Sequence, residues 1–243
     1  MSAHAGKVAV ITGASRGVGA GLAEYFHAQG LKLGLCSRSA PVLEGAEGVV
    51  RRELDVRDPA ALAELAEAVA RELGPIDLWV NNAAVLEPVV FQRELDPLAL
   101  ADHLAINVGG VLNGTQAFLA HRAPEAVLLN ISSGAALKGY AAWSAYCASK
   151  AALDRLSECL ALEEGERGLR VHAVAPGVID TDMQRTIRSK SRDEFPMLDK
   201  FLQLKADDAF NSPEYVAREL LAIAFDPSKR PEEVVVRLES EKG

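Results

Sequence analysis

The sequence predicts an α/β protein with a doubly wound parallel sheet of about seven strands and helices on both faces. Apolar, β-branched runs alternate with helix-period segments from one end of the chain to the other. The second, fourth and sixth runs are mostly apolar without alternation, which is typical of strands buried on both faces of a parallel sheet. No linker, repeat or low-complexity tract divides the 243 residues, so we expect one domain over residues 1–243.

Seven runs fit strands, in the order 7–13, 31–38, 49–56, 76–84, 126–133, 169–176 and 233–240. Helical patterns lie between them. The segment 59–74 carries one apolar stripe, with Pro59 at its start and Gly74 at its end. Three further segments show the same kind of pattern, namely 97–121, 144–166 and 213–225.

The segment 184–212 departs from this alternation. It has no strand pattern and mixes a charged stretch, "RSKSRDEF", with large apolar residues such as Phe195 and Phe201. Long excursions between a late strand and a late helix are often lids or binding loops, so we expect a substrate loop here. The alternative is a pair of short surface helices with no special role.

Composition excludes several classes of function. The net charge of −8 and the pI of about 5.2 argue against nucleic acid or an anionic membrane as the main partner. No apolar run is long enough to span a bilayer, and the start of the chain does not resemble a signal peptide. The three scattered cysteines fit reduced thiols, and the histidines lack metal-ligand spacing. We therefore expect a cytoplasmic protein without a catalytic metal.

A glycine cluster, "TGASRGVG", follows the first predicted strand. Gly13, Gly17 and Gly19 lie where a strand turns into a helix, and glycine there permits close backbone approach. Free N–H groups at a helix start attract a pyrophosphate. The spacing differs from G-x-G-x-x-G, and tight strand-to-helix turns also use glycine for structural reasons. The position of the cluster favours a dinucleotide.

The charges near the predicted ribose favour NADP(H). A site for the unphosphorylated ribose usually has a carboxylate at the end of the second strand, whereas this strand ends in "CSRS" with Arg38. Arg16 stands in the glycine loop, and two guanidinium groups fit a 2′-phosphate. Asp55, at the end of the third strand, is a candidate acceptor for the adenine amino group, or a strand-end turn carboxylate.

In the stretch "AYCASKAAL", Tyr146 and Lys150 stand four residues apart at the start of a helical pattern. This spacing makes the two side chains neighbours on one helix face. Such a pair also arises by chance on surface helices, so its meaning depends on what accompanies it.

The accompanying motifs resemble the short-chain dehydrogenase/reductase family over essentially the whole chain. They are "TGASRGVG", "DV" at 55–56, "NNAA" at 81–84, "AIN" ending at Asn107, "ISS" at 131–133, "YCASK" at 146–150 and "PGVIDT" at 176–181. The resemblance implies a Rossmann-type fold. Ala84 stands where the family usually has glycine. "GYAAWSAYC" and "APGVIDTDMQ" further resemble sepiapterin reductases and their bacterial relatives that reduce vicinal diketones such as benzil.

The resemblance implies a catalytic set of Asn107, Ser133, Tyr146 and Lys150. Tyr146 would protonate the carbonyl oxygen, and we expect the Lys150 cation to lower its pKa from the ordinary value near about 10. Ser133 would stabilise the developing charge. Ser132 is its rival, but alternate strand residues face opposite sides and the spacing favours Ser133. Asn107 would fix a water next to Lys150.

The expected cofactor contacts follow the same motifs. They are Gly13, Ser15, Arg16, Gly17, Val18, Gly19, Arg38, Asp55, Val56, Asn82, Ala83, Tyr146, Lys150, Pro176, Gly177, Val178 and Thr181. Trp143 and Met183 are candidate substrate contacts.

These residues predict an NADPH-dependent carbonyl reductase acting on a small diketone-like or pterin-like molecule. Two alternatives are a non-catalytic NADP(H) sensor or scaffold and an NADP-dependent dehydrogenase working in the oxidative direction. The resemblance also implies a homodimer or homotetramer formed through the helices 97–121 and 144–166.

Overall fold

A computed structural model of the protein describes residues 4–242. Its centre is a sheet of seven strands in the order β3-β2-β1-β4-β5-β6-β7, and every neighbouring pair is parallel. The predicted α/β fold is therefore confirmed. The strands are β1 (Val8–Thr12), β2 (Lys32–Ser37), β3 (Val49–Glu53), β4 (Ile76–Asn81), β5 (Arg122–Ile131), β6 (Arg170–Ala175) and β7 (Val235–Arg237).

The order of the strands reverses between β1 and β4. The chain runs outward through β2 and β3, returns to the centre, and continues on the other side of β1 with β4. Connections on the two sides leave the sheet in opposite directions, which opens a crevice at the carboxyl ends of these two strands. A ligand site is expected there in any open parallel sheet.

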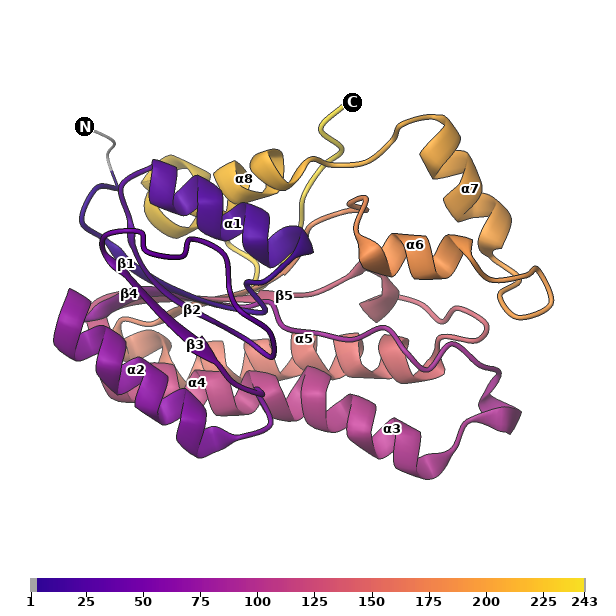
Figure 1. Ribbon diagram of the computed structural model, residues 1–243, viewed down its shortest axis with the longest axis horizontal. Coiled ribbons are helices and arrows are strands. Elements are labelled where there is room, and N and C mark those ends of the chain that lie inside the picture. The colour runs from indigo at the N-terminus through magenta and orange to yellow at the C-terminus, as the bar shows by residue number, and fades with distance from the viewer. Residues whose placement is uncertain (1–3, 243) are drawn as a thin grey trace.

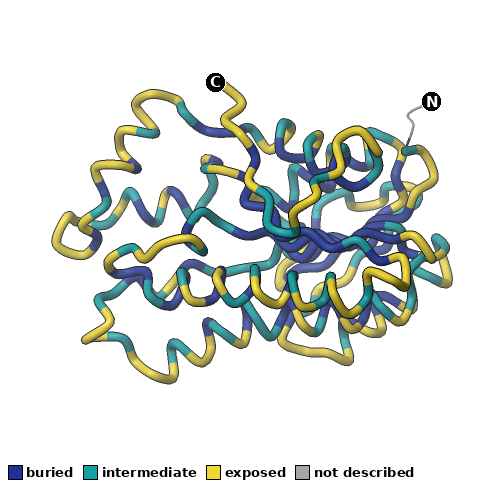
Figure 2. Tube along the Cα trace, turned by 180° about the vertical axis from the view of Figure 1, so that it is seen from behind, coloured by how far each residue is buried: buried dark blue, intermediate teal, exposed yellow. Residues whose placement is uncertain are grey.

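Two helices cover one face of the sheet and three long helices cover the other (Figure 1). α1 (Gly17–Ala28) and α8 (Pro213–Phe225) pack side by side on the first face. α2 (Pro59–Leu73), α4 (Gly110–His121) and α5 (Ser144–Glu164) lie on the second. Figure 2 shows the sheet as a buried band, with helices whose residues alternate between buried and exposed.

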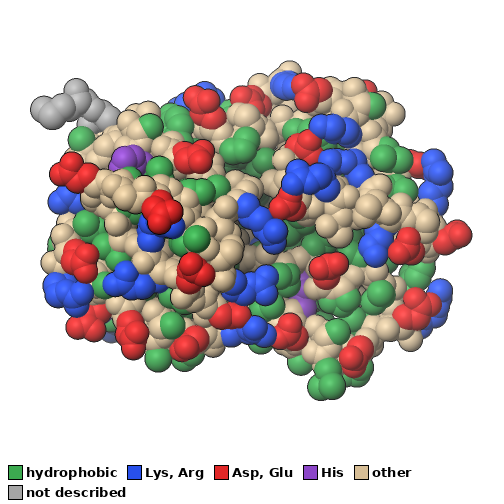
Figure 3. Space-filling model, in the orientation of Figure 1, with side chains coloured by type: hydrophobic (Ala, Val, Ile, Leu, Met, Phe, Trp, Pro, Cys, Tyr) green, Lys and Arg blue, Asp and Glu red, His purple; other side chains and the backbone are tan. Residues whose placement is uncertain are grey.

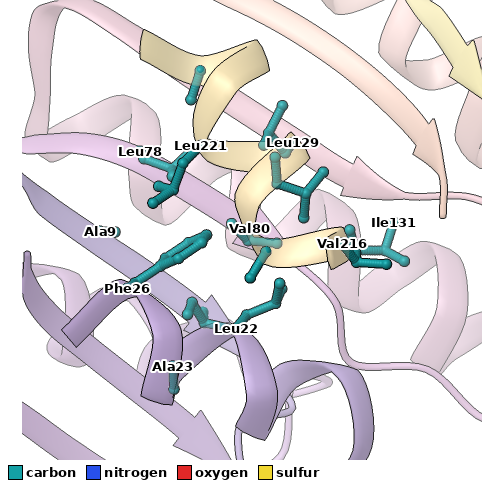
Figure 4. Close-up of a cluster of buried hydrophobic side chains, with 14 of the residues drawn as sticks. Ala9, Leu22, Ala23, Phe26, Leu78, Val80, Leu129, Ile131, Val216 and Leu221 are labelled. Carbon is teal, nitrogen blue, oxygen red and sulfur yellow. The ribbon is translucent and has the colours of Figure 1, made fainter. Parts of the chain in front are cut away.

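The core under α1 and α8 is assembled from both layers (Figure 4). Leu22 and Phe26 of α1 and Leu221 of α8 point at Val80 and Leu129 of the sheet. All five side chains are buried. Each such side chain contributes about 1.5–3 kcal/mol through the loss of exposed apolar surface. This packing fixes the sheet edge from which the functional loops emerge.

The predicted helix 97–121 contains an irregular turn. α3 (Pro97–Leu104) begins at Asp96, whose carboxylate accepts from the Leu98 N–H at 3.0 Å. A π-helical turn at Ala105–Gly109 then connects it to α4, and Asn107 lies in that turn. Turns of this kind inside α-helices are frequent at functional sites.

The segment 184–212 contains two short helices, as the surface-helix alternative expected. α6 (Asp182–Arg188) and α7 (Leu198–Ala206) pack against each other beyond the carboxyl edge of the sheet (Figure 1). Phe195 and Phe201 are nevertheless buried, against Trp143 of the main body. No helix in residues 4–242 is both long and apolar enough to traverse a bilayer.

Candidate active site

A cavity of about 990 Å³ opens at the carboxyl edge of the sheet. It runs from the glycine loop after β1, past the ends of β4, β5 and β6, to the segment with α6 and α7. Lys and Arg side chains gather across the middle of this face, between α1 and α6 (Figure 3). The cavity is large enough for a dinucleotide and a small second molecule.

Backbone at the glycine loop approaches its neighbours too closely for any side chain. A Cβ on Gly13, which has a φ of +72°, would lie 2.8 Å from the Cα of Ala83. A Cβ on Gly19 would lie 2.3 Å from the carbonyl oxygen of Gly13. The start of α1 therefore presents bare backbone to the cavity, and this cradle fits the pyrophosphate of a dinucleotide.

Hydrogen bonds fasten the glycine loop to the end of β4. The Asn82 amide donates to the carbonyl oxygens of Thr12 at 2.9 Å and Gly13 at 3.3 Å. The Thr12 hydroxyl accepts from the N–H groups of Asn82 and Ala83. Asn82 thus shapes the cofactor end of the cavity through the backbone. Asn81 instead belongs to a buried network with Trp79 and Asn130.

The end of the cavity expected to hold the ribose phosphate carries Arg38, Arg16 and Asp55. Arg16 lies 3.4 Å from the Asp182 carboxylate, across the cavity at the start of α6. Asp55 accepts from the Arg57 guanidinium at 2.7 Å, and this hydrogen bond lowers the pKa of its carboxyl group. Within residues 4–242, Arg38 forms no ion pair. Its guanidinium is available to an anion.

The two neighbouring serines at the end of β5 face opposite sides. The Ser132 hydroxyl donates to Asp154 of α5, and Ser132 is buried. Ser133 faces Tyr146, and its hydrogen bond lowers the pKa of the phenol. Strand alternation produces this division, because consecutive side chains point to opposite faces.

Tyr146 and Lys150 lie one helical turn apart at the start of α5, and both are buried. The Lys150 ammonium donates to the Ile131 carbonyl oxygen at 2.7 Å and lies 5.7 Å from the centre of the Tyr146 ring. Burial lowers the pKa of Lys150 to about 8. The lysine stays predominantly charged at neutral pH.

In the protein without a cofactor the pKa of Tyr146 is raised rather than lowered, which differs from the expectation based on Lys150. Burial raises the pKa of the phenol, and this effect outweighs the opposing hydrogen bond from Ser133. A desolvated phenol resists ionisation because the phenolate loses its hydration. Tyr146 therefore keeps its proton, as a proton donor requires.

Asn107 lies behind the cavity wall and is hydrogen-bonded to the loop after β4. Its side chain accepts from the Val85 N–H at 2.8 Å and donates to the Val85 carbonyl oxygen at 2.9 Å. It also donates to Nε2 of His103 at 2.9 Å. His103 donates from Nδ1 to the Glu87 carbonyl oxygen at 2.7 Å, and burial lowers its pKa, so the ring is neutral. The two side chains hold the loop after β4 to α3.

The far end of the cavity is aromatic. Trp143 stacks on Phe195 with ring centroids 4.8 Å apart and contacts Phe201 and Tyr140. Trp143 also meets the Tyr146 ring edge to face at 5.7 Å. Met183 packs against the same cluster. These side chains wall off the space beside Tyr146 with apolar surface.

Every predicted site residue lines this cavity except Gly19 and Asn107, which lie directly behind its wall. Ala84 also lines it, with an ordinary negative φ, so the methyl group causes no backbone strain. The sequence reading missed His103, Tyr140, Gln184, Lys200 and Arg237. Only His103 carried a local signal, since it precedes Asn107 by one helical turn.

Comparisons with known proteins agree with this geometry. A family model described as short chain dehydrogenase matches residues 7–192. A benzil reductase ((S)-benzoin forming) of Bacillus subtilis (strain 168) is 30% identical over 226 residues, covering 88% of this chain and 91% of the relative.

Two solved structures share the fold along nearly the whole chain. The KRED1-Pglu enzyme has a TM-score of 0.87 and 34% identity, with 96% of this chain and 100% of that chain covered. A short chain dehydrogenase from Burkholderia cenocepacia J2315, solved in complex with NADP, has a TM-score of 0.79 and 27% identity, with 97% of each chain covered.

Proposed function

The chain belongs to the short-chain dehydrogenase family and is a nicotinamide-dependent oxidoreductase, and we propose that it is an NADPH-dependent carbonyl reductase. One observation carries the proposal. A buried, protonated Tyr146 lies beside the Ser133 hydroxyl and one helical turn from Lys150, in the cavity that begins at the glycine cradle. A member of the fold that only binds the cofactor has no need of this combination.

In this proposal, the residues of the chain supply a proton and stabilise charge. Reduced nicotinamide, when bound, supplies the hydride that adds to the carbonyl carbon. Tyr146 donates its phenolic proton to the carbonyl oxygen, so the product is an alcohol. The Ser133 hydroxyl donates a hydrogen bond to the same oxygen while negative charge develops on it. Lys150 provides a positive field that favours the phenolate left after transfer.

The proposed cofactor is NADPH, held by the glycine cradle and by Arg38 and Arg16. The motifs predicted two guanidinium groups at the ribose, and both line the cavity. Asp182 already neutralises part of the Arg16 charge, whereas Arg38 forms no ion pair within residues 4–242. Arg38 is therefore the main determinant of phosphate preference. The structure solved with NADP, that of the Burkholderia cenocepacia relative, supports this choice.

The proposed substrate is a small diketone with an apolar body. The aromatic wall around Trp143 offers flat apolar surface next to the reacting position. The benzil reductase of Bacillus subtilis supports a vicinal diketone over a pterin. In this proposal, α6, α7 and the loops around them form the substrate loop. A cytoplasmic location stays a prediction.

We also propose a homo-oligomer. Leu98 of α3, Leu112 of α4 and Leu156 and Leu162 of α5 are exposed large apolar side chains on the outer helices. Association through these helices would remove that surface from water. Sedimentation of the wild type beside Leu112→Glu tests the proposal, with a lower mass expected for the variant.

The test of the activity is NADPH oxidation by the purified protein with benzil, a small aliphatic diketone and sepiapterin. The expected result is turnover of benzil or the aliphatic diketone that Tyr146→Phe abolishes. NADPH binding without oxidation of any carbonyl would favour the sensor or scaffold. If the matching alcohols reduce NADP+ faster than the carbonyls oxidise NADPH, at the same pH and concentrations, the oxidative direction is favoured.

A further inference from the structure

Arg237, the last residue of β7, reaches the substrate end of the cavity. Its Nη1 atom lies 3.7 Å from the position of a Cβ built on Gly134. Gly134 directly follows Ser133, whose hydroxyl contacts the Tyr146 phenol. Neighbouring Cα atoms are about 3.8 Å apart, so the guanidinium lies beside the stretch of backbone that carries Ser133.

The Arg237 guanidinium has no partner of its own. Within residues 4–242 it forms no ion pair, side-chain hydrogen bond or stacking contact with an aromatic ring. Most other arginines that line the cavity are paired, as in Arg16 and Arg185 with Asp182. Arg237 is exposed as well as lining the cavity, so its guanidinium is accessible to an anion that enters from solvent.

A second cation contributes to the charge at this end. Lys200 of α7 also lines the cavity, and its ammonium donates to the Tyr140 hydroxyl at 3.3 Å rather than to a carboxylate. The Lys138 ammonium lies 5.5 Å from the centre of the Tyr140 ring. Neither lysine forms an ion pair among the described residues. The wall formed by 134–140 and α7 is therefore positively charged.

The carboxylates of the cavity lie elsewhere. Asp55 and Asp182 are engaged by arginines at the cofactor end. Glu87 follows β4, which is separated from β7 by β5 and β6 in the sheet. In the loop after β4, the Glu87 carbonyl oxygen accepts from His103 of α3 at 2.7 Å. The side-chain atoms recorded within 4 Å of a Cβ built on Gly134 are both from Arg237, at 3.7 and 4.0 Å.

We propose that Arg237 forms an anion subsite and that the natural substrate is a small oxo acid, with its carboxylate close to the ketone that is reduced. A carboxylate accepts two parallel hydrogen bonds from one guanidinium, which would orient the ketone toward Tyr146 and Ser133. The proposal rests on the proposed reductase activity, and it assigns an acidic natural substrate in place of the neutral diketone. The product would be the corresponding hydroxy acid, formed with the hydride of NADPH and the proton of Tyr146.

A matched pair of substrates tests the subsite. Phenylglyoxylate and 1-phenylpropane-1,2-dione share the aromatic ketone and differ in a carboxylate against an acetyl group. We expect Arg237→Gln to lower kcat/KM for phenylglyoxylate by about 10- to 100-fold, through a higher KM, because a charge-assisted bond is lost. The neutral diketone should change by less than about 2-fold. Arg237→Lys should recover part of the loss.

The control variant is Arg230→Gln, an exposed arginine on the turn before the same strand and outside the cavity. It should leave both substrates unchanged. An equal loss for the acid and the diketone in Arg237→Gln, or no loss for either, would overturn the subsite while leaving the reductase activity standing.

A binding measurement keeps the test independent of turnover. In titration calorimetry with NADPH present, benzoate should bind the wild type more tightly than benzamide, and Arg237→Gln should remove the difference. Equal affinity for benzoate and benzamide in the wild type would refute the subsite. Absence of NADPH oxidation with every carbonyl, combined with a retained benzoate preference, would refute the proposed function alone.

Discussion

The two ends of the cavity are held together in different ways. Around Tyr146, Lys150 and Asn107, buried side chains are tied by short hydrogen bonds to the backbone of neighbouring strands and loops. Around α6 and α7, the ties are aromatic packing and ion pairs at the surface, such as Asp180 with Arg188 and Lys205.

The buried polar atoms without partners follow the same division. Within residues 4–242 they belong to Arg51, Trp143, Gln184 and Arg188, and the last three lie in or against the segment of α6 and α7. An unpaired buried polar group costs about 1–3 kcal/mol. The catalytic end is therefore fixed before substrate arrives. The opposite end keeps buried polar groups whose missing hydrogen bonds a substrate or a rearrangement can supply.

The largest effect should come from the fixed end. Replacing Tyr146 with Phe removes the only proposed proton donor and keeps the ring packing, so kcat for diketone reduction should fall by about 100- to 10,000-fold. NADPH affinity should stay within a few-fold. Steady-state kinetics and cofactor fluorescence titration measure the two quantities. Tyr140→Phe is the matched control, and an equal loss of activity there would contradict the assignment of Tyr146.

The second effect concerns the stability cost of the fixed end. Burial depresses the pKa of Lys150 from 10.5 to about 8, which corresponds to a cost of about 3 kcal/mol for its charged form. The cost is complete below pH 8 and disappears as the pH rises toward 10.5, because the folded state loses the proton first. Lys150→Met should therefore be inactive but more stable than the wild type at pH 7.

Urea unfolding at several pH values checks this linkage. The stability advantage of Lys150→Met over the wild type should shrink between pH 8 and 10. The Ile131 carbonyl oxygen loses its donor in the variant, which subtracts a constant amount at every pH. A stability advantage that does not vary with pH would show that the pKa of Lys150 is not lowered in the folded protein.

The third effect concerns the cofactor end. Arg38→Gln should reduce the preference for NADPH over NADH by about 10- to 100-fold, because a guanidinium is lost from the 2′-phosphate. Arg16→Gln should have a smaller effect, since Arg16 shares its charge with Asp182. The ratio of kcat/KM values for the two cofactors measures both. A larger effect for Arg16 than for Arg38 would reverse the assignment.

The sequence predicted which residues meet at the fixed end because its signals are local, and their catalytic roles stay predictions. Gly13, Tyr146 and Lys150 each stand at a definite place on a strand end or a helix, and strand alternation separated Ser133 from Ser132. Contacts between distant segments could not be predicted in this way. His103 reaches the Glu87 carbonyl oxygen in the loop after β4 only because of how α3 packs, and Arg237 enters the cavity only because β7 joins the sheet next to β6.

The direction expected for the pKa of Tyr146 differed from the structure because it too depends on contacts between distant segments. Spacing on a helix gives the distance to Lys150, but the burial of Tyr146 depends on a cluster that also draws residues from α7, the segment before it and the loop after β4. For the segment 184–212, the sequence likewise shows the composition but does not predict where the segment packs. Charge and apolar residues indicated two short helices or a loop, whereas the packing of Phe195 on Trp143 required the folded structure.

The smallest effect should come from the ion pairs at the end with α6 and α7. The Asp180 carboxylate accepts from Arg188 at 2.7 Å and from Lys205 at 2.6 Å, and these bonds lower the pKa of its carboxyl group. It joins the turn after β6 to both short helices. Because the network is partly exposed, Asp180→Asn should cost at most about 1 kcal/mol, which lowers Tm by about 2–4 °C.

The functional consequence should appear in KM for the diketone, with a rise of about 2- to 5-fold and little change in kcat, because Tyr146 and Ser133 are untouched. High salt screens exposed pairs, so the difference in KM between Asp180→Asn and the wild type should narrow as the ionic strength rises from about 0.05 to about 1 M. In the wild type, the contribution of the network should be present above the ordinary carboxyl pKa and be lost as the pH falls through the depressed one.

Asp193→Asn is the control, since Asp193 is exposed on the same segment and forms no ion pair among the described residues. If both variants change KM equally, the effect is one of net charge rather than of the Asp180 network. If Asp180→Asn instead lowers kcat as strongly as the Tyr146 variant, the two ends of the cavity are coupled, and the division between a fixed and an adaptable end fails.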